Sequence, residues 1–459
     1  MSKGFSALIL AAGKGTRFKS DQAKVLHPLM GRPMLQLIVD SVRGLKPNTI
    51  FVVVGYQKDE VKKQPFAVDL EFITQKNQLG TAHAVLAASA NLRKAQDRDV
   101  LIINGDLPLI RTETLKPLLM THHRNGNALT FMTTDLDVPT GFGRVVDIGD
   151  NDFRIIEEKD ATPLQRKIRE VNVGIYLFRI KDLLGALPKV SNQNKKGEYY
   201  LTDLIAILSQ ENKKVGKCRT AQTDEIVGVN DRYELARAAE ALRLRRFKSL
   251  ANKGVTVLDP STTWIDLDVK IGRDTTIYPS VVVEGNSVIG TNCTLYPHVH
   301  ISESRIGRGV RILSSTVIEN SIIRDEAQVG PFTHLRPKNV IKRGAKVGNF
   351  VEMKNTVFGQ FSKAGHLSYL GDSEVEDSVN IGAGTITCNY DGEKKSKTHI
   401  ESGAFIGSGV ELVAPVRIGK KAYVGAGSTI TKDVSPESLA VSRSRQIEKK
   451  GWAKRKGKK

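Results

Sequence analysis

The sequence predicts two consecutive folds, an α/β domain with a Rossmann-like, mostly parallel sheet and then a parallel β-helix of hexapeptide repeats. The first prediction rests on short apolar runs that alternate with amphipathic segments over residues 1–230. The second rests on aliphatic residues that recur every six positions from residue 265 onward. No helix or ordinary strand has that period, whereas solenoids with triangular coils repeat such a unit three times per coil.

The expected strands of the first domain are short and apolar on both faces. Such strands should lie inside a sheet that helices cover on both sides. Residues 80–92 should contribute helices of this kind. The expected strands are residues 7–10, 50–54, 100–103 and 128–131.

One long helix should connect the two folds. Residues 231–250 are rich in Ala, Leu, Arg and Glu and contain neither Gly nor Pro. The expected domains are an α/β domain at 1–230, a linker helix at 231–252, a β-helix at 253–447 and a basic tail at 448–459.

The six-residue repeat runs through most of the second half. A non-repeating insert at 387–399 should interrupt its coils, and loops that break a regular scaffold are favoured places for function. The inward aliphatic residues of the repeat should be Ile265, Ile271, Ile277, Val283, Ile289, Leu295 and Ile301, and then Val329, Leu335, Ile341, Val347 and Met353.

The composition indicates a globular protein in a reducing compartment, which we expect to be the cytoplasm. Of 459 residues, 40% are hydrophobic, which is ample for two packed cores. Cys218, Cys293 and Cys388 lie far apart and lack the spacing of a zinc site or a disulfide framework. The first apolar run, 5–12, fits a buried strand better than a signal peptide, and no run approaches the ~18 residues of a membrane span.

The net charge of +20 raises the alternative of a protein that binds nucleic acid or another anionic surface. Part of the excess lies in the tail after Gln446, and the rest is scattered without the interleaved aromatic residues of a single-strand platform. Phosphorylated small molecules account for the charge equally well. We therefore expect no nucleic-acid partner, whereas weak, salt-suppressed DNA binding would favour the alternative.

A glycine-rich turn, residues 13–17, follows the first expected strand. Glycines at such a turn let backbone N–H groups approach phosphate oxygens, while a nearby cation offsets the phosphate charge. The turn fits neither a dinucleotide fingerprint nor a Walker loop. We expect Arg17 and Lys24 to hold phosphates.

This turn, Gly-x-Gly-Thr-Arg followed by Lys24, resembles the signature of sugar-1-phosphate nucleotidyltransferases. Further matching segments follow in family order: Gln75, Gln78-Leu79-Gly80-Thr81, Asn104-Gly105-Asp106-Leu107-Pro108, Gly141-Phe142-Gly143-Arg144, Glu157, Asn172 and Val229-Asn230. The resemblance implies sugar contacts for Gly141, Glu157 and Asn172, and Asn104 stands where some members have tyrosine. The residues it implies for UTP and the UDP-sugar are Leu10, Ala11, Gly13, Gly15, Arg17, Lys24, Gln75, Gln78, Gly80, Thr81, Asn104, Gly141, Glu157, Asn172 and Asn230.

Nucleotidyl transfer needs no protein nucleophile, only in-line positioning and charge neutralisation. Asp106 follows an apolar strand, at the edge where open α/β sheets bind ligands. With Asn230 it offers two hard oxygen ligands for Mg²⁺. Gln78 offers both an amide donor and an acceptor, which match the edge of uracil.

A second polar cluster lies within the repeats. Residues about 18 apart stack on neighbouring coils, so Arg336, Lys354 and the segment 366–369 should project into one region. Two cations suit a phosphate group, and the imidazole of His366 suits proton abstraction.

The whole chain is similar to the bacterial family of bifunctional N-acetylglucosamine-1-phosphate uridyltransferases and glucosamine-1-phosphate N-acetyltransferases, from the first domain to the Gly451-Trp452 basic tail. The resemblance implies a left-handed β-helix, a homotrimer, UTP and acetyl-CoA as co-substrates, Mg²⁺ as cofactor and His366 as the base of acetyl transfer. It implies that the amino-sugar phosphate is bound by Arg336, Lys354, Tyr369 and Asn380. It implies that acetyl-CoA is bound by Ala383, Asn389, Tyr390, Ser408, Ala426 and Arg443.

Two consecutive reactions follow from this resemblance. Acetyl-CoA would acetylate glucosamine 1-phosphate, and UTP would then convert the N-acetylglucosamine 1-phosphate to UDP-N-acetylglucosamine and pyrophosphate. The alternative within the same class is a nucleotidyltransferase of single activity whose β-helix serves only regulation or assembly. The polar cluster around His366 and the insert favour the bifunctional enzyme.

Overall fold

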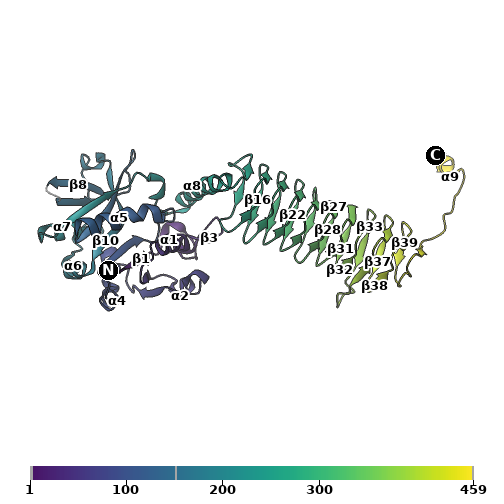
Figure 1. Ribbon diagram of the computed structural model, residues 1–459, viewed down its shortest axis with the longest axis horizontal. Helices are drawn as coiled ribbons and strands as arrows, with labels where there is room; N and C mark the ends of the chain where they lie inside the picture. The colour runs from purple at the N-terminus through teal and green to yellow at the C-terminus, as the bar shows by residue number, and fades with distance from the viewer. Residues whose placement is uncertain (1–3, 150–151, 457–459) are drawn as a thin grey trace. The chain divides into compact units, whose positions relative to one another are not determined.

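The computed structural model describes residues 4–149 and 152–456 and divides into two compact units, Met1–Leu242 and Arg243–Lys459. The division falls inside α8 (Arg232–Ala251), which confirms the expected single helix at 231–250 (Figure 1). Residues 457–459 of the predicted tail lie outside the described residues, and α9 (Trp452–Lys456) occupies the part before them. Among the described residues, no helix has both the length and the hydropathy to cross a membrane.

The first unit contains a nine-stranded sheet in which all four expected strands are present. β10 is antiparallel to β6 and β7, while β1, β4, β5 and β6 pair in parallel, as do β7 and β11. The main path runs β11 (Val215–Arg219), β7 (Leu129–Asp135), β10 (Glu170–Arg179), β6 (Asp99–Asn104), β1 (Phe5–Ala11), β4 (Ile50–Val54) and β5 (Glu71–Thr74). The hairpin of β8 (Arg144–Gly149) and β9 (Asp152–Ile156) joins at β10, and β2 (Pro28–Leu29) pairs with β3 (Arg32–Pro33).

Helices cover both faces of this sheet because successive strand residues point to opposite sides. In β1, Ala7 and Ile9 pack into one buried cluster and Leu8 into the other. The first cluster includes α1 (Met34–Arg43), α2 (Lys58–Lys62) and α5 (Thr112–Asn125). The second includes α3 (Thr81–Ala87), α4 (Ser89–Lys94), α6 (Ile180–Ala186) and α7 (Asp203–Gln210). The expected helices at 80–92 are thus α3 and α4, which meet at Ala88.

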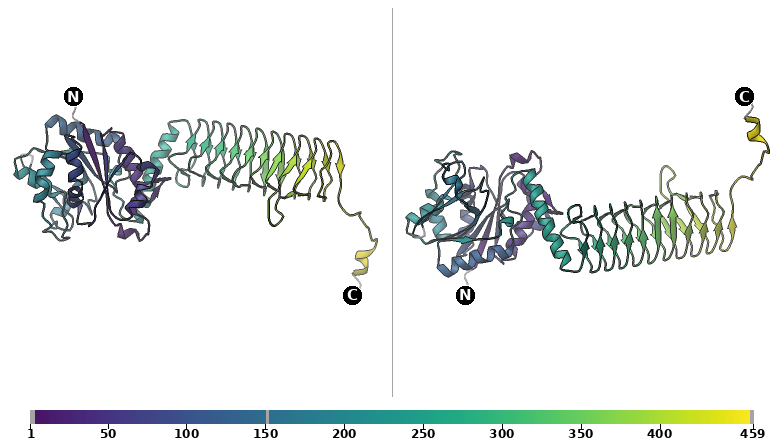
Figure 2. Two further views of the ribbon diagram at one scale, coloured as in Figure 1. Left: turned by 90° about the horizontal axis from the view of Figure 1, so that it is seen from below. Right: turned by 90° about the horizontal axis from the view of Figure 1, so that it is seen from above.

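The second unit is a parallel β-helix (Figure 2). Its coils stack on one another, and their strands form three parallel sheets. The first coil sheet holds β12 (Thr256–Val257), β15 (Thr276–Ile277), β18 (Thr294–Leu295), β21 (Arg311–Ile312), β24 (Gln328–Val329), β27 (Lys346–Asn349), β30 (Lys363–His366), β33 (Asn380–Ile381), β36 (Phe405–Ile406), β39 (Tyr423–Val424) and β41 (Leu439–Ala440). The second coil sheet holds β13 (Trp264–Ile265), β16 (Val282–Glu284), β19 (His300–Ser302), β22 (Val317–Glu319), β25 (His334–Leu335), β28 (Glu352–Lys354), β31 (Tyr369–Gly371), β34 (Ile386–Cys388), β37 (Glu411–Val413) and β40 (Thr429–Ile430). The third coil sheet holds β14 (Lys270–Ile271), β17 (Val288–Ile289), β20 (Arg305–Ile306), β23 (Ile322–Ile323), β26 (Val340–Ile341), β29 (Val357–Phe358), β32 (Ser373–Val375), β35 (Thr398–Ile400) and β38 (Val416–Ile418).

The residues of the six-residue repeat fill the interior of the coils. Every inward aliphatic residue expected from the sequence belongs to one buried cluster, and none is more than 9% exposed. This confirms the β-helix and the fold class predicted for the whole chain. A continuous core of stacked aliphatic residues stabilises such a solenoid, because each coil buries apolar surface only against its neighbours.

The insert is shorter than the sequence suggested. Its expected ends fall inside regular strands, since Thr387 pairs with Leu412 and Thr398 pairs with Val416. The part that departs from the repeat is therefore 389–397, the loop that stands out from the coils in Figure 2. The polar residues Thr387 and Thr398 escaped recognition as coil residues because both are buried hydroxyl-bearing side chains.

Candidate active sites

The glycine-rich turn lies at the carboxyl end of β1. Gly15 has φ +61, in the left-handed region, and precedes the 3₁₀ helix Thr16–Phe18. A Cβ at Gly15 would lie 2.7 Å from the Cβ of Lys24. Glycine is required here for both reasons, since it allows the backbone angle and the close approach of Lys24.

Lys24 holds together the two expected metal ligands. Its Nζ donates to Oδ2 of Asp106 at 2.9 Å and to Oδ1 of Asn230 at 3.2 Å. Two backbone hydrogen bonds, both at 2.8 Å, fix this arrangement. The N–H of Gly105 donates to the carbonyl of Leu10 in β1, and the N–H of Val229 donates to the carbonyl of Asp106. The two side-chain oxygens therefore converge on one cationic group.

A cavity of about 1100 Å³ opens beside these residues. Most residues predicted for the UTP and sugar site line it, and they come from several strands, from the start of α3 and from the loops between these elements. Ala11, Gly15 and Lys24 stand outside the lining, although Lys24 contacts two residues within it. The predicted residues in the lining are Leu10, Gly13, Arg17, Gln75, Gln78, Gly80, Thr81, Asn104, Asp106, Gly141, Glu157, Asn172 and Asn230.

Gln75 and Thr81 shape one wall of this cavity. The Nε2 of Gln75 donates to the carbonyl of Gly80 at 3.3 Å and to Nδ1 of His83 at 3.0 Å. Gly80 has φ +114, and a Cβ there would lie 2.5 Å from the carbonyl oxygen of Tyr199. These contacts fix the start of α3. There, Oγ1 of Thr81 accepts a hydrogen bond at 3.0 Å from the backbone N–H of Leu201.

Gln78 lies over the residue that follows β4. A Cβ at Gly55 would lie 2.6 Å from the Nε2 of Gln78, so the amide side chain covers this glycine. An amide that lines the cavity can exchange a donor and an acceptor with the edge of a base. Asn104, further along the lining, has its Nδ2 2.5 Å from the position that a Cβ at Gly174 would take.

Glu157 and Asn172 lie at another part of the lining. The Oε1 of Glu157 accepts from Oγ1 of Thr202 at 3.2 Å, and burial raises the pKa of this carboxyl group. Asn172 is 9% exposed, and its Nδ2 donates to the hydroxyl of Tyr176 at 2.7 Å. A carboxylate can accept hydrogen bonds from sugar hydroxyls, and an amide can both accept from them and donate to them.

Acidic residues gather around Glu157. Burial, and then the charges of Glu157 and Asp160, raise the pKa of Asp203 to about 6. A cation also lies here, since the Nζ of Lys196 is 5.9 Å from the centre of the Tyr200 ring. Its charge lowers the pKa of Glu157, which burial raises.

The segment 196–202 contributes residues that the sequence did not indicate. Lys196, Tyr200 and Thr202 all line the cavity. No glycine motif or charge pattern marks this segment, and Thr202 reaches Glu157 from 45 residues away in the chain. Only the three-dimensional fold brings them together.

His366 lies at a corner of the β-helix, at the end of β30. Its Nδ1 donates to Oδ1 of Asn349, one coil away, at 2.6 Å. Because an amide oxygen only accepts, the hydrogen of the neutral imidazole lies on Nδ1, which leaves Nε2 free to take a proton. The sequence did not indicate Asn349, and the only available signal was its position 17 residues before His366.

Lys354 and Tyr369 lie in strands of the second coil sheet, and Arg336 directly follows its strand β25. Arg336 bonds to Glu352 at 3.0 Å, and Glu352 pairs with Tyr369. The side chain of Lys395 and then the charge of Arg336 lower the pKa of Lys354. Three cationic side chains thus crowd one patch, which favours an anion such as a phosphate group. Lys395, from the insert, was not expected there.

Asn380 is placed differently from the other residues predicted for the amino-sugar phosphate. It begins β33 on the first coil sheet, where it pairs with Lys363. The residue that continues the register from His366 is Ala383, three residues after Asn380 and beyond the end of β33. Within one chain Asn380 therefore lies on a different coil sheet from Lys354.

Three of the residues predicted for acetyl-CoA follow His366 at one position of successive coils. The strand registers of β30, β33, β36 and β39 continue from His366 to Ala383, Ser408 and Ala426. The backbone confirms this stacking, since Gly409 donates to the carbonyl of Ala383 at 2.7 Å. Arg443 is exposed, and its Nη1 donates to the carbonyl of Ala426 at 2.7 Å.

Asn389 and Tyr390 differ in their exposure. Asn389 is 8% exposed, and its Nδ2 donates to Oδ2 of Asp372 at 2.6 Å. Tyr390 is 59% exposed. Asn389 is thus held within its own chain, whereas the ring of Tyr390 can contact another molecule.

Comparisons with known proteins bear on both units. The MobA-like NTP transferase domain family matches residues 7–176, the GMPPB C-terminal domain matches 265–360, and the bacterial transferase hexapeptide (six repeats) matches 397–432. "Bifunctional protein GlmU" of Thermotoga maritima is 48% identical over 98% of this chain and 99% of that protein. The protein of the same name from Geobacillus sp. (strain WCH70) is 46% identical over 98% of this chain and 97% of its own length. The chain belongs to the GlmU family.

Membership of the GlmU family agrees with the fold of each unit. The NTP transferase match begins in β1 and ends in β10, so it spans the glycine-rich turn, Asp106, Glu157 and Asn172. The hexapeptide match covers coils after the insert. Among solved structures, a putative glucose-1-phosphate thymidylyltransferase from Bacillus anthracis is a distant match, with 19% identity and a TM-score of 0.42 over 51% of this chain and 94% of that one.

We expect Asn349→Ala to lower kcat of the GlmU-type acetyl transfer by about tenfold, because the imidazole of His366 loses the acceptor that fixes its tautomer. The measurement is thiol release from acetyl-CoA. Asn355→Ala is the control, since Asn355 also makes a side-chain hydrogen bond to the following coil, here as a donor to Asp372 at 2.6 Å. An equal loss in both variants would mean that Asn349 acts only on coil stability.

Proposed function

We propose that this GlmU-family chain acetylates glucosamine 1-phosphate with acetyl-CoA and then transfers UMP from UTP to the N-acetylglucosamine 1-phosphate. The observation that supports the proposal is the presence of two separate clusters of polar and charged side chains, one in each unit. One is the cavity beside Lys24 and Asp106. The other comprises the corner at His366 and the cationic patch of Arg336, Lys354 and Lys395.

Uridylyl transfer would take place in the cavity of the first unit. A phosphate oxygen of the sugar phosphate attacks the α-phosphorus of UTP, and the bond to the leaving pyrophosphate breaks. Arg17 and Lys24 would offset the charge of the triphosphate, while the glycine-rich turn presents N–H groups. Gln78 would bind uracil, and Glu157 with Asn172 would orient the sugar.

Asp106 and Asn230 would hold Mg²⁺. They fit this ion because their oxygens already converge on the ammonium group of Lys24. Among the described residues, no group of three or more His, Cys, Asp or Glu side chains could hold a metal ion. The remaining ligands would be substrate phosphates and water, as is usual for Mg²⁺. The ion supplies positive charge that offsets the developing charge on the phosphates.

Acetyl transfer would take place at the corner of the β-helix. The amine of glucosamine 1-phosphate would attack the thioester carbonyl while Nε2 of His366 takes the amine proton, the C–S bond would break, and the proton would pass to the leaving thiolate of CoA. Arg336 and Lys354 would hold the sugar phosphate. The column of Ala383, Ser408 and Ala426 would border acetyl-CoA, since its small residues leave room beside His366.

The two activities can be separated in one assay with glucosamine 1-phosphate, acetyl-CoA and UTP. Thiol release reports acetyl transfer, and pyrophosphate release reports uridylyl transfer. Pyrophosphate release that depends on acetyl-CoA supports the proposed order of the reactions. Pyrophosphate release from N-acetylglucosamine 1-phosphate without any thiol release from glucosamine 1-phosphate would support an enzyme of single activity.

We also propose a homotrimer in the cytoplasm. The exposed ring of Tyr390 supports an acetyl-transfer site that two chains share. The three cysteines are free thiols, which supports a reducing compartment. The family resemblance supplies the number of subunits.

We expect a shared site to allow complementation between two inactive variants. Oligomers that contain both His366→Ala and Tyr390→Ala chains should regain acetyl transfer, because some sites then combine an intact His366 with an intact Tyr390. The measurement is thiol release after co-expression, with sedimentation to establish that the assembly has the mass of three chains. Activity that never exceeds the mean of the separate variants would mean that each site lies within one chain.

A further inference from the structure

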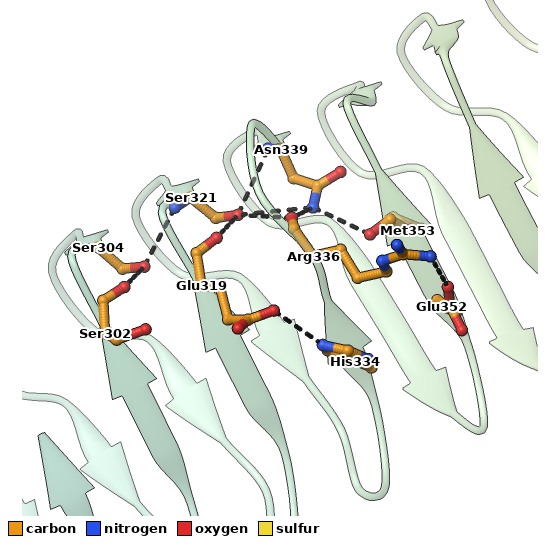
Figure 3. A network of polar contacts seen from close by, with 9 residues as sticks. All are labelled: Ser302, Ser304, Glu319, Ser321, His334, Arg336, Asn339, Glu352 and Met353. Atoms are coloured by element: carbon orange, nitrogen blue, oxygen red, sulfur yellow. Dashed lines mark hydrogen bonds and ion pairs between the residues drawn. The ribbon is translucent and has the colours of Figure 1, made fainter. Parts of the chain in front are cut away.

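Four charged or titratable side chains from three successive coils lie together on the outer face of the second coil sheet (Figure 3). His334 and Arg336 come from one coil, Glu319 from the preceding coil and Glu352 from the following coil. His334 pairs with Val317 on one side and with Glu352 on the other. Continuing this register by two residues places Glu319 directly beside Arg336, because alternate strand residues share a face.

Each observed contact joins two neighbouring coils diagonally, between strand positions that are two residues apart in register. Nε2 of His334 lies 3.1 Å from Oε2 of Glu319, and Nη1 of Arg336 donates to Oε1 of Glu352 at 3.0 Å. A carboxylate only accepts, so His334 is the donor in its pair. Arg336 therefore leans toward the following coil, where Lys354 lies, although a second carboxylate stands beside it.

Glu319 is close enough to act on Arg336. The hydrogen bond to Glu352 is the largest cause that raises the pKa of Arg336, and the charge of Glu319 also contributes to the increase. If nothing bound Glu319, its carboxylate could pair with Arg336 directly. Such a pair would draw the guanidinium group one coil away from Lys354 and add a competitor for any phosphate.

We propose that His334 is a positioning residue of the amino-sugar phosphate site, because it binds Glu319 and so keeps Arg336 directed toward Lys354. The inference rests on the proposed function of Arg336 as a phosphate ligand. The groups that face His334 are Glu319 from β22, Glu352 from β28 and Arg336 from its own coil.

The chain contains a matched control two coils earlier. His300 lies 2.8 Å from Oε2 of Glu284 with the same diagonal geometry. The residue beside Glu284 on the next coil is Ser302, whereas the residue in the equivalent position beside Glu319 is Arg336. A change at His300 therefore removes an equivalent surface contact without freeing a carboxylate beside an arginine.

The test uses the full-length chain and measures KM and kcat of acetyl transfer against glucosamine 1-phosphate. We expect His334→Ala to raise this KM by about twofold to fivefold, in the range of a part-exposed ion pair, with kcat and the KM for acetyl-CoA unchanged. Adding Glu319→Gln to His334→Ala should restore the KM, because the amide no longer competes as an anion. His334→Gln, which keeps a donor, should stay close to the parent, and so should His300→Ala.

The outcomes separate the inference from the function on which it rests. If Arg336→Gln raises the KM but His334→Ala does not, the role of His334 is wrong and the phosphate site stands. If Glu319→Gln fails to restore the KM, His334 acts through something other than Glu319 and the inference is overturned. If Arg336→Gln leaves the KM unchanged, the proposed function of Arg336 fails first.

Discussion

We expect His366→Ala to lower the rate of acetyl transfer by about 10²- to 10⁴-fold, the usual contribution of a general base, and to leave uridylyl transfer unchanged. The side chain is exposed at a corner, and its Nδ1 is occupied by Asn349, so Nε2 is the atom that can take the amine proton. The measurement is thiol release from acetyl-CoA in the presence of glucosamine 1-phosphate. Pyrophosphate release from UTP in the same preparation provides the internal control.

The matched variant is His298→Ala. His298 is also an exposed histidine at a corner of the β-helix, with φ 61, but the predicted substrate residues lie on other coils. It should keep both activities. Thiol release that is unchanged in His366→Ala, or lost equally in His298→Ala, would contradict the assignment of His366 as the base.

The β-helix was predictable because its core follows a rule that is local in sequence. Each six-residue unit contributes one inward aliphatic side chain, so residues such as Ile277 and Leu295 are recognised without knowledge of their neighbours. Register between coils is not local. The spacing from His300 to Val317 is 17 residues, and that from His334 to Glu352 is 18. These slips decide which side chains meet, and the sequence does not show where they occur.

The contacts around the predicted catalytic residues illustrate this limit. His366 was identified from its residue type and from the family resemblance, but its partner Asn349 depends on a 17-residue coil. In the first unit, Glu157 was identified and Thr202 was not, because only the packing of β9 against α7 brings them together. The sequence thus suggested candidate residues for the chemistry, whereas the side chains that contact them became visible only in the structure.

Asp106→Ala should have the opposite effect on the two activities. We expect uridylyl transfer to fall by about 10²-fold or more, because the triphosphate loses a ligand for its metal ion and the charge that develops on it is less well offset. Lys24 also loses its partner at 2.9 Å and becomes free to bind a phosphate in the wrong place. The measurement is pyrophosphate release as a function of Mg²⁺ concentration, with acetyl transfer as the control for folding.

Asp106→Asn separates the charge from the contact. The amide keeps an oxygen near Lys24 and Asn230 but carries no charge, so it should need more Mg²⁺ than the parent and remain more active than Asp106→Ala. The fold should tolerate both changes, since Val229 bonds to the backbone carbonyl at this position. If Asp106→Ala released pyrophosphate at the parent rate in low Mg²⁺, Asp106 would not be a ligand, and the convergence of its carboxylate with Asn230 would serve only to anchor Lys24.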